Sequence, residues 1–249
     1  MLLDGRIVLV TGSGRGIGAA TVKLLAMNGA TVAVNYNKNE QTATDVVNEI
    51  NNSGGKALLI QADVTDLQQV EKMFGEIETK LGKIDTLVLN AGINFKPTPF
   101  LELKWEDFEH KYVGEMKASY YCCKLAIPSM LERKNGCIIV VSSGLSRRSG
   151  PGFMAHSAAK AGLNSFVKSL ATELSPQGIR VNAIAPGLTM TDAIGWMPPE
   201  RIAATSKMVP LQRVGLPEDM AGAILFLASD YGKFITGGYI PVDGGMTML

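Results

Sequence analysis

The sequence lacks the features that mark several large classes of proteins. Its 24 lysines and arginines nearly balance its 23 aspartates and glutamates, so no surplus of charge predicts a nucleic-acid partner. The longest apolar run, AGAILFLA, covers only residues 221–228 and is far short of a membrane span. The first residues, MLLDGRIVLV, hold no apolar stretch of signal-peptide length. These absences predict a cytoplasmic protein without membrane or nucleic-acid partners.

Cysteine is also scarce. Cys122, Cys123 and Cys137 show neither the spacing of metal ligands nor a C-x-x-C pair. An odd number of cysteines with two adjacent indicates reduced thiols that fill the core of a cytosolic protein. We therefore expect no metal site.

Short β-branched runs alternate with longer segments of helical pattern. The runs cover residues 6–12, 31–36, 56–63, 84–92, 136–143, 179–187 and 237–245. The spacing predicts a helix from Gly16 to Asn28 that stops at Gly29, and a capping box from Thr65 to Gln68. Continuous apolar strands between helices predict a parallel sheet covered on both faces. With no linker or repeat, we expect one α/β domain over residues 1–249.

A glycine-rich turn, VTGSGRGIG, follows the first run and opens the first helix. Glycines 12, 14, 16 and 18 allow the backbone to approach a pyrophosphate, which the helix N-terminus then stabilises. The spacing departs from G-x-G-x-x-G because Ile17 takes the place of the third glycine, and the alternative interpretation is a flexible turn without a ligand.

The end of the second run indicates which nucleotide is bound. NAD sites place an acidic residue there to bind the ribose 2′-hydroxyl. This chain reads Asn35, Tyr36, Asn37 and Lys38 instead, with no acid before position 40. Arg15 and Lys38 could face a 2′-phosphate, although both could equally be solvated surface charges. The pattern favours NADP(H) over NAD(H).

These segments together resemble the short-chain dehydrogenase/reductase family along essentially the whole chain. TGSGRGIG matches its T-G-x-x-x-G-x-G turn, and LNAG at 89–92 matches its N-N-A-G. Ser143 lies 13 residues before position 156 and Lys160 lies four after it, which is the spacing of the family's Ser…Tyr-x-x-x-Lys set. NAIAPG at 182–187 and ITGGYIPVDGGM at 235–246 match later segments. The nearest branch resembles the 3-oxoacyl-[acyl-carrier-protein] reductases.

The resemblance implies a Rossmann-type doubly wound sheet of about seven strands in a three-layer αβα sandwich. It also implies hydride transfer between NADP(H) and a carbonyl or alcohol, in a homo-oligomer that is usually a tetramer and otherwise a dimer. The implied cofactor-binding residues are Gly12, Ser13, Gly14, Arg15, Gly16, Ile17, Gly18, Asn35, Tyr36, Asn37, Asp63, Val64, Asn90, Ala91, Gly92, Lys160, Pro186, Gly187, Thr189 and Thr191. The implied catalytic positions are Ser143, His156, Lys160 and Glu115.

Two of these catalytic positions depart from the family pattern. The family's proton donor is a tyrosine, and this chain has His156. EMKASYYCCK at 115–124 aligns with a pattern resembling N-L-K-G-S-F-Y-C-T-K, so Glu115 takes the place of an asparagine. A free imidazole titrates near ~6.5, and a nearby Lys160 ammonium would disfavour its protonation. We hypothesise that the Glu115 anion offsets that charge and restores a protonatable histidine.

Other interpretations of the same residues remain. The chain could bind a nicotinamide nucleotide with little or no redox activity, or use the pocket for proton transfer such as isomerisation or dehydration. Glu115 could be only an ion-pair partner of Lys160. A Ser143–His156–Glu115 hydrolase triad is disfavoured because no G-x-S-x-G elbow is present. His110, within EDFEHK, is expected on a solvated helix face.

The segment 188–210 lies where the family carries its substrate lid. It holds Met190, Trp196, Met197 and Met208, which could close over an apolar substrate or pack at a subunit contact. Arg147 and Arg148 could steer an anionic substrate, such as an acyl group on a phosphopantetheine carrier, or could simply be solvated. The identity of the small carbonyl substrate is not encoded in any motif.

Overall fold

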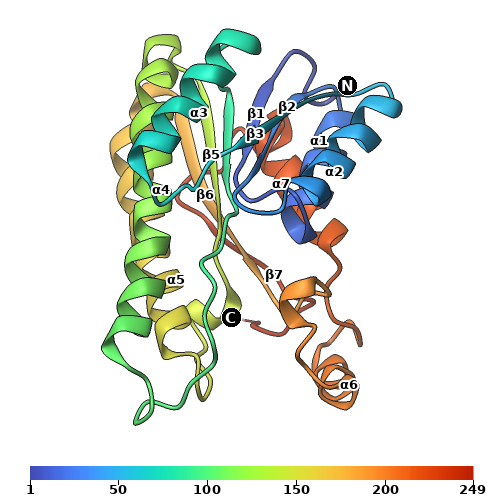
Figure 1. Cartoon of the computed structure of the whole chain (residues 1–249), viewed down its shortest axis with the longest axis vertical. Helices are drawn as coiled ribbons and strands as arrows, with labels where there is room; N and C mark the ends of the chain where they lie inside the picture. The colour runs from blue at the N-terminus through green and yellow to red at the C-terminus, as the bar shows by residue number, and fades with distance from the viewer. Residues whose placement is uncertain (249) are drawn as a thin grey trace.

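The computed structural model describes residues 1–248, which fold around one seven-stranded sheet (Figure 1). The strands are β1 (Ile7–Val10), β2 (Thr31–Tyr36), β3 (Lys56–Gln61), β4 (Thr86–Leu89), β5 (Gly136–Val141), β6 (Ile179–Pro186) and β7 (Tyr239–Val242). All neighbours are parallel, in the order β3-β2-β1-β4-β5-β6-β7. The predicted doubly wound parallel sheet is confirmed. Its order reverses between β1 and β4, where such sheets bind ligands outside the carboxyl ends of the strands.

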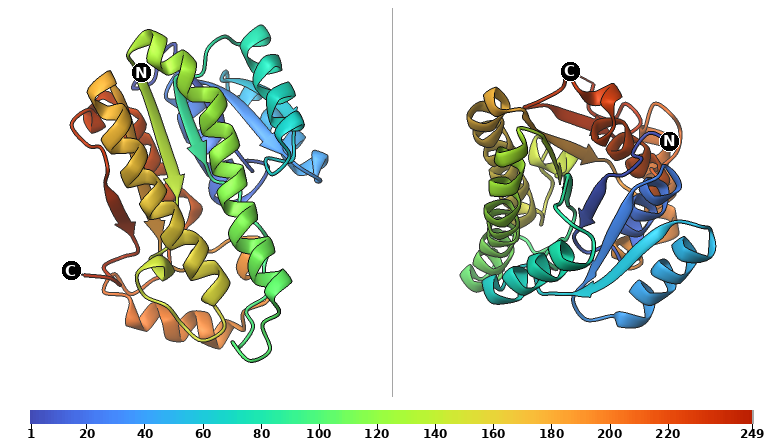
Figure 2. Two further views of the ribbon diagram at one scale, coloured as in Figure 1. Left: turned by 90° about the vertical axis from the view of Figure 1, so that its left-hand side faces the viewer. Right: turned by 90° about the horizontal axis from the view of Figure 1, so that it is seen from above.

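Helices cover both faces of the sheet and make the three-layer sandwich visible in Figure 2. They are α1 (Gly16–Met27), α2 (Glu40–Asn52), α3 (Leu67–Lys80), α4 (Trp105–Arg133), α5 (Met154–Leu174), α6 (Pro199–Met208) and α7 (Pro217–Ala228). α3, α4 and α5 lie on one face, and α1, α2 and α7 lie on the other (Figure 1). α6 stands apart, beyond the carboxyl edge of the sheet (Figure 1). No helix of residues 1–248 has both the length and the apolar character needed to cross a membrane.

Two apolar layers form the core, one on each side of the sheet. Successive side chains of a strand point to opposite faces, so Leu9 packs with the α3–α5 side while Val8 and Val10 pack with the α1–α7 side. Burial on both faces explains why the strands read as continuous apolar runs. The three cysteines are buried and free, and burial raises the pKa of the Cys122 thiol to about 12.

Local signals in the sequence predicted the ends of α1 closely and misplaced the start of α3. α1 ends one residue before the predicted position, with Gly29 at φ +96° just beyond it. The predicted capping box from Thr65 to Gln68 is wrong by one residue. Asp66 is the N-cap of α3 and accepts a hydrogen bond from the N–H of Gln69. Thr65 instead donates both its N–H and its hydroxyl to Asp63.

Candidate active site

The glycine-rich turn between β1 and α1 leaves the first turn of α1 without a side-chain cap. Arg15 is the N-cap residue, its side chain makes no capping hydrogen bond, and no acidic side chain lies in the first turn. Asn39 and Asp66, by contrast, cap α2 and α3 with their side chains. The uncapped N–H groups and the positive end of the helix dipole suit a pyrophosphate.

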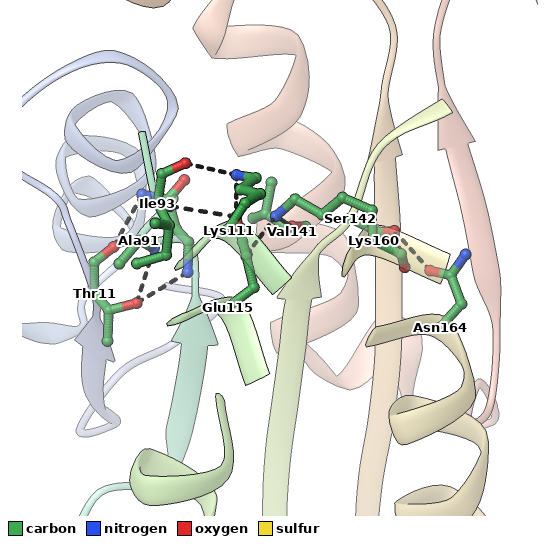
Figure 3. A network of polar contacts seen from close by, with 10 residues as sticks. Thr11, Ala91, Ile93, Lys111, Glu115, Val141, Ser142, Lys160 and Asn164 are labelled. Atoms are coloured by element: carbon green, nitrogen blue, oxygen red, sulfur yellow. Dashed lines mark hydrogen bonds and ion pairs between the residues drawn. The ribbon is translucent and has the colours of Figure 1, made fainter. Parts of the chain in front are cut away.

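Close packing against the segment after β4 explains Gly12 and Gly18 of this turn. A Cβ on Gly18 would lie 2.6 Å from both Asn90 Nδ2 and the carbonyl oxygen of Gly12, and one on Gly12 would lie 2.9 Å from Ala91 Cα. Asn90 Nδ2 donates to the carbonyls of Thr11 (2.9 Å) and Gly12 (3.0 Å). The N–H of Ala91 donates to the Thr11 hydroxyl at 3.0 Å (Figure 3). Asn90 and Ala91 therefore hold the turn in place.

Asn35, predicted to contact the nucleotide, lies inside the protein beneath the turn. Its Oδ1 accepts the N–H of Gly12 at 3.0 Å, and its Nδ2 donates to the carbonyl of Ala62 at 3.2 Å. Ser13 is also fully buried and donates its hydroxyl to the carbonyl of Val10 at 2.8 Å. These polar side chains support the shape of the turn from within.

Asp63 lies at the rim beyond β2 and β3. Asn37 Nδ2 donates to one carboxylate oxygen at 3.0 Å, and the Thr65 N–H (2.9 Å) and hydroxyl (2.7 Å) donate to the other. Burial raises the pKa of Asp63, but these hydrogen bonds and the charge of Lys38 outweigh it and lower the pKa overall. Val64 follows as a buried side chain. The carboxylate therefore stays ionised where the resemblance places an adenine.

The segment after β6 meets the glycine-rich turn from the other side. A Cβ on Gly16, whose φ is +53°, would lie 3.3 Å from the methyl carbon of Thr191. Thr189 is buried, and its hydroxyl donates to the carbonyl of Gly187 at 3.1 Å. Pro186 is the last residue of β6. The predicted cofactor residues of these two distant segments are therefore brought together at one sheet edge.

Two lysines hold the Glu115 carboxylate between them (Figure 3). Lys111 Nζ lies 2.5 Å from Oε1, and Lys160 Nζ lies 3.0 Å from Oε2. Lys111 also donates to the carbonyl of Ile93 (2.6 Å), and Lys160 donates to the carbonyl of Val141 (2.8 Å). The three side chains are 3%, 2% and 8% exposed for Lys111, Glu115 and Lys160, so water screens this cluster little.

The cluster carries one negative and two positive groups. Burial raises the pKa of Glu115, but Lys160 and Lys111 outweigh it and lower the pKa to about 2. Burial lowers the pKa of Lys111, and the charge of Lys160 lowers it further, against the attraction of Glu115. With both lysines charged, the ionised carboxylate leaves the cluster with a net charge of about +1.

His156 lies one helical turn before Lys160 on α5, against aromatic rings. Its ring stacks on Phe95, with centroids 4.8 Å apart and 18° between the planes, and meets the edge of Phe153 at 6.5 Å. Its Nδ1 atom is buried and has no hydrogen-bond partner among residues 1–248. Nε2 also makes no hydrogen bond in that part of the chain but is not sealed in this way, so it is the nitrogen available to a ligand.

The imidazole is neutral in this environment. Burial lowers the pKa of His156 to about 3, the charges of Lys160 and Lys111 act in the same direction, and Glu115 only partly opposes them. The structure therefore does not favour the hypothesis that Glu115 restores a protonatable histidine. The hypothesis weighed one lysine against one carboxylate, and it left out the burial of the ring, which lowers the pKa most, and the second buried lysine beside the pair.

Ser143 lies two residues beyond Val141, whose carbonyl binds Lys160. Its Oγ accepts the N–H of Leu145 at 3.1 Å, and its carbonyl accepts the hydroxyls of Ser146 (2.6 Å) and Tyr239 (3.2 Å). The preceding Ser142 is bound to Asn164 on α5 at 2.6 Å, as Figure 3 shows. Ser143 is thus held just beyond β5 by Tyr239 of β7, and its neighbour Ser142 is held by Asn164 of α5.

The side chains that a hydrolase triad would use are not joined as one. Both Glu115 oxygens face lysines, and within residues 1–248 no hydrogen bond links Glu115 to His156 or His156 to Ser143. His110 is exposed on α4, as predicted.

Sequence reasoning missed Lys111 and Phe95. Lys111 and Glu115 stand four residues apart on one helix, a spacing that places oppositely charged side chains next to each other. That signal was present in the sequence. Phe95 had no comparable signal, because it lies in an irregular segment whose path only the fold defines.

The segment 188–210 contains a short 3-10 turn, Asp192–Ile194, and α6. None of the residues of α6 is buried. Met190, Trp196 and Met208 are 42%, 53% and 62% exposed. These apolar side chains are therefore available to cover a substrate or a second subunit.

Known protein families can be compared with this geometry. The family model described as Enoyl-(Acyl carrier protein) reductase matches residues 12–247. A 3-oxoacyl-[acyl-carrier-protein] reductase of Synechocystis sp. is 40% identical over 248 residues, which are 99% of each chain. The 3beta-hydroxysteroid dehydrogenase 1 of Eggerthella lenta is 38% identical over 249 residues, covering 99% of this chain and 95% of the relative.

Solved structures also superpose on nearly the whole chain. A 7 alpha-hydroxysteroid dehydrogenase complexed with NADH and 7-oxo glycochenodeoxycholic acid superposes with a TM-score of 0.93 at 33% identity, covering 98% of this chain and 94% of its own. A short-chain type dehydrogenase/reductase from Mycobacterium marinum gives a TM-score of 0.93 at 32% identity, covering 99% and 97%. The match extends from the glycine-rich turn through the last strand, and the chain belongs to the short-chain dehydrogenase/reductase family.

Proposed function

We propose that this chain is an NADP(H)-dependent oxidoreductase that interconverts a carbonyl compound and its alcohol, as a 3-oxoacyl reductase does, on a single domain of residues 1–249. The observation that carries this proposal is the uncapped N-terminus of α1, which shares one sheet edge with Thr191 and Lys160. A bound nicotinamide supplies or accepts the hydride.

The side chains at the reacting end take three roles. Ser143 Oγ holds the substrate oxygen. The Lys160 ammonium has three hydrogens, of which Glu115 and Val141 take two, and the third binds the nicotinamide ribose. His156 offers Nε2 to the substrate oxygen as a neutral group. A neutral imidazole does not release a proton near neutral pH, so solvent next to it provides the proton of the product hydroxyl.

The preference for NADP(H) is supported at the end of β2. Asn35 points inward to Gly12, and the residues that follow it at the end of this strand, Tyr36, Asn37 and Lys38, include no acid. Arg15 and Lys38 are both exposed, so their charges are free to face a 2′-phosphate. NADPH is therefore expected to bind with a lower dissociation constant than NADH in a direct titration.

We also propose that residues 188–210 close over the substrate and exclude water. Arg147 and Arg148 are exposed beside the serine segment and would receive an anionic substrate, such as one linked to an acyl carrier. Arg147 is held there by Tyr239, whose ring centroid lies 3.8 Å from its guanidinium carbon.

The assembly and compartment are part of the same proposal. Leu101, Trp105 and Phe234 are 96%, 65% and 101% exposed, and such apolar surface favours a homo-oligomer, either a tetramer or a dimer. Three free thiols favour the reducing cytoplasm. Light scattering of the purified protein tests the assembly.

One observation favours a second function, which is binding of the nucleotide with little redox turnover. Burial and two lysines lower the pKa of His156 to about 3, far from the value that suits proton exchange at neutral pH. The ring also lies between Phe95 and Phe153, which limits its movement toward a substrate.

A single experiment separates the two functions. NADPH binding is followed by fluorescence, and its consumption is followed with a panel of ketones and 3-oxoacyl thioesters for the native chain, His156→Ala, His156→Tyr and the exposed control His110→Ala. Native turnover that His156→Ala abolishes and His110→Ala retains supports the oxidoreductase. Tight binding without native turnover, with turnover gained in His156→Tyr, supports the second function. Failure to bind any nicotinamide nucleotide rejects both.

A further inference from the structure

Lys111 has no role in the function proposed above, yet it is among the most buried charged groups of the chain. Its side chain is 3% exposed, and it lies 2.5 Å from the Glu115 carboxylate. A lysine is rarely buried to this extent unless it is paired, because desolvation of an ammonium is costly. Its neighbours show what the burial achieves.

Lys111 connects three elements that surround the reacting end. Its ammonium donates to the carbonyl of Ile93, in the segment after β4, and to Glu115 on its own helix α4. It also lies 5.0 Å from the ring centroid of Phe95, which stacks on His156 from α5. The N–H of Ile93 donates back to Glu115 Oε1 at 3.3 Å. The backbone N–H and carbonyl of Ile93 therefore both bind side chains of α4, which fastens the segment after β4 to this helix.

The lysine also determines how Glu115 is shared. Because Lys111 takes Oε1, only Oε2 reaches Lys160, at 3.0 Å. Without Lys111, both carboxylate oxygens would be free to turn to Lys160 and draw on its remaining hydrogen. The lysine thus favours an arrangement in which Lys160 keeps a donor for the nucleotide.

Within residues 1–248, the charged groups that act on His156 all belong to this cluster. Lys160 comes from its own helix α5, and Lys111 and Glu115 come from α4. The rings of Phe95 and Phe153 complete its surroundings and carry no charge. Two cations and one anion therefore face the imidazole, so the charge of Lys111 decides whether the cluster is neutral or positive.

We propose that Lys111 is a positioning residue of the active site: it fastens Glu115 and the segment carrying Phe95 around His156, and its charge adds to the burial and to the Lys160 charge that disfavour protonation of that imidazole. The role of Lys111 in turnover rests on the proposed function, but its effects on protonation and on the segment after β4 do not require turnover. Replacing the lysine while keeping its length would release the segment and leave a neutral Lys160–Glu115 pair beside the histidine.

The test uses the full chain without substrate. Nuclear magnetic resonance follows both histidines from pH 2 to 9 in the native protein, Lys111→Met, Lys111→Arg and the exposed control Lys117→Met on the same helix. His110 supplies the second signal in each sample. We expect Lys111→Met to raise the titration midpoint of His156 by about one pH unit or more, while Lys111→Arg and Lys117→Met leave it near the native value.

Amide hydrogen exchange of Ile93 provides an independent measurement. We expect exchange at this N–H to become roughly tenfold faster or more in Lys111→Met, because its acceptor Glu115 loses a fixed position. A His156 titration and an Ile93 exchange rate that are both unchanged in Lys111→Met would overturn the proposal. So would a variant that melts like the native protein and changes only Ile93 exchange, since the charge would then have no effect on His156.

These readouts separate this proposal from the function proposed above. If Lys111→Met shifts the His156 signal while the native chain reduces no ketone, the positioning role stands and the oxidoreductase fails. If the native chain turns over and Lys111→Met changes neither readout, the oxidoreductase stands and the positioning role fails. If Lys111→Met does not fold, Lys111→Gln is measured in its place under the same criteria.

Discussion

The two parts of the candidate site, one around the glycine-rich turn and one around Glu115 and Lys160, use different chemical groups. Around β1 and β2 the functional groups are backbone N–H groups, glycines and buried amides, and the side chains of Asn35 and Asn90 bond to main-chain atoms. Around α4 and α5 the groups are ionisable side chains packed against each other, with Glu115 between two ammonium groups.

The difference teaches how one fold changes its chemistry without losing its ligand site. Backbone donors keep their position whatever the neighbouring side chains are, so a resemblance in glycines carries over reliably. The protonation state of a side chain depends on its burial and on every charge within a few ångströms, so an argument made from two residues changes once burial and a third charge are counted.

The largest effect is expected when a side chain is added to the glycine-rich turn. We expect Gly18→Ala to weaken NADPH binding by about 100-fold or to unfold the protein, because overpacking of this kind costs about 1–3 kcal/mol. The Cβ of the alanine would lie 2.6 Å from Asn90 Nδ2 and from the Gly12 carbonyl oxygen. Gly222→Ala on α7, where nothing lies within 4 Å, is the matched control and should be neutral or stabilising. NADPH titrations and thermal melts measure both variants. If Gly18→Ala binds NADPH with the dissociation constant of the native protein, the close packing of this turn is not what the nucleotide site requires.

The buried cluster gives the next effect. Glu115→Gln leaves Lys111 and Lys160 without their counter-charge, so we expect the free energy of unfolding to fall by about 3–5 kcal/mol. Glu76→Gln, which removes the partner of Lys80 on the surface of α3, should cost less than about 1 kcal/mol. Urea unfolding measures both. Equal losses in the two variants would show that burial adds nothing to the Glu115 pair.

The neutral histidine predicts a dependence of stability on pH. The pKa of His156 is lowered to about 3 in the folded protein, so between about pH 6.5 and 3 the unfolded chain binds the additional proton. Stability from this group is therefore complete above pH 6.5 and declines as the pH falls, by up to about 1.4 kcal/mol per pH unit.

His156→Gln should lack this contribution, and the difference from the native protein isolates it from the carboxylates. His110→Gln serves as the matched control because His110 is exposed on α4. Urea unfolding at pH 5, 6 and 7 provides the measurement. Parallel curves for the native protein and His156→Gln would mean that the imidazole is not held neutral by the fold.

The smallest effect concerns the choice of nucleotide. Arg15→Ala and Lys38→Ala should each raise the dissociation constant of NADPH by up to about fivefold and leave that of NADH nearly unchanged, because an exposed charge pair contributes at most about 1 kcal/mol. Lys168→Ala, an exposed lysine of α5, is the control. Added salt should reduce the difference. Equal effects on both nucleotides would remove the argument for a 2′-phosphate.

The sequence predicted the fold closely for reasons visible in particular elements. The run TVAVNY predicted β2 with both of its ends, Thr31 and Tyr36, because all residues of this strand after Thr31 are buried in a doubly covered sheet. The capping box of α3 was misplaced by one residue because Asp63 competes for the Thr65 hydroxyl. Asn35 was assigned toward the nucleotide because its position in the chain is at a strand end, while its direction depends on the turn above it.

The sequence by itself determined the alternation of strands and helices, the glycines that let β1 turn closely into α1, and the residues at positions 115, 143, 156 and 160. These follow from periodicity and local backbone sterics, which act over a few residues. Only the tertiary structure decided that Lys111 joins Glu115 and Lys160, that Phe95 stacks on His156, and that the imidazole is neutral. Desolvation and Coulomb interactions depend on distance in space, and distance in space is set by packing of segments far apart in the chain.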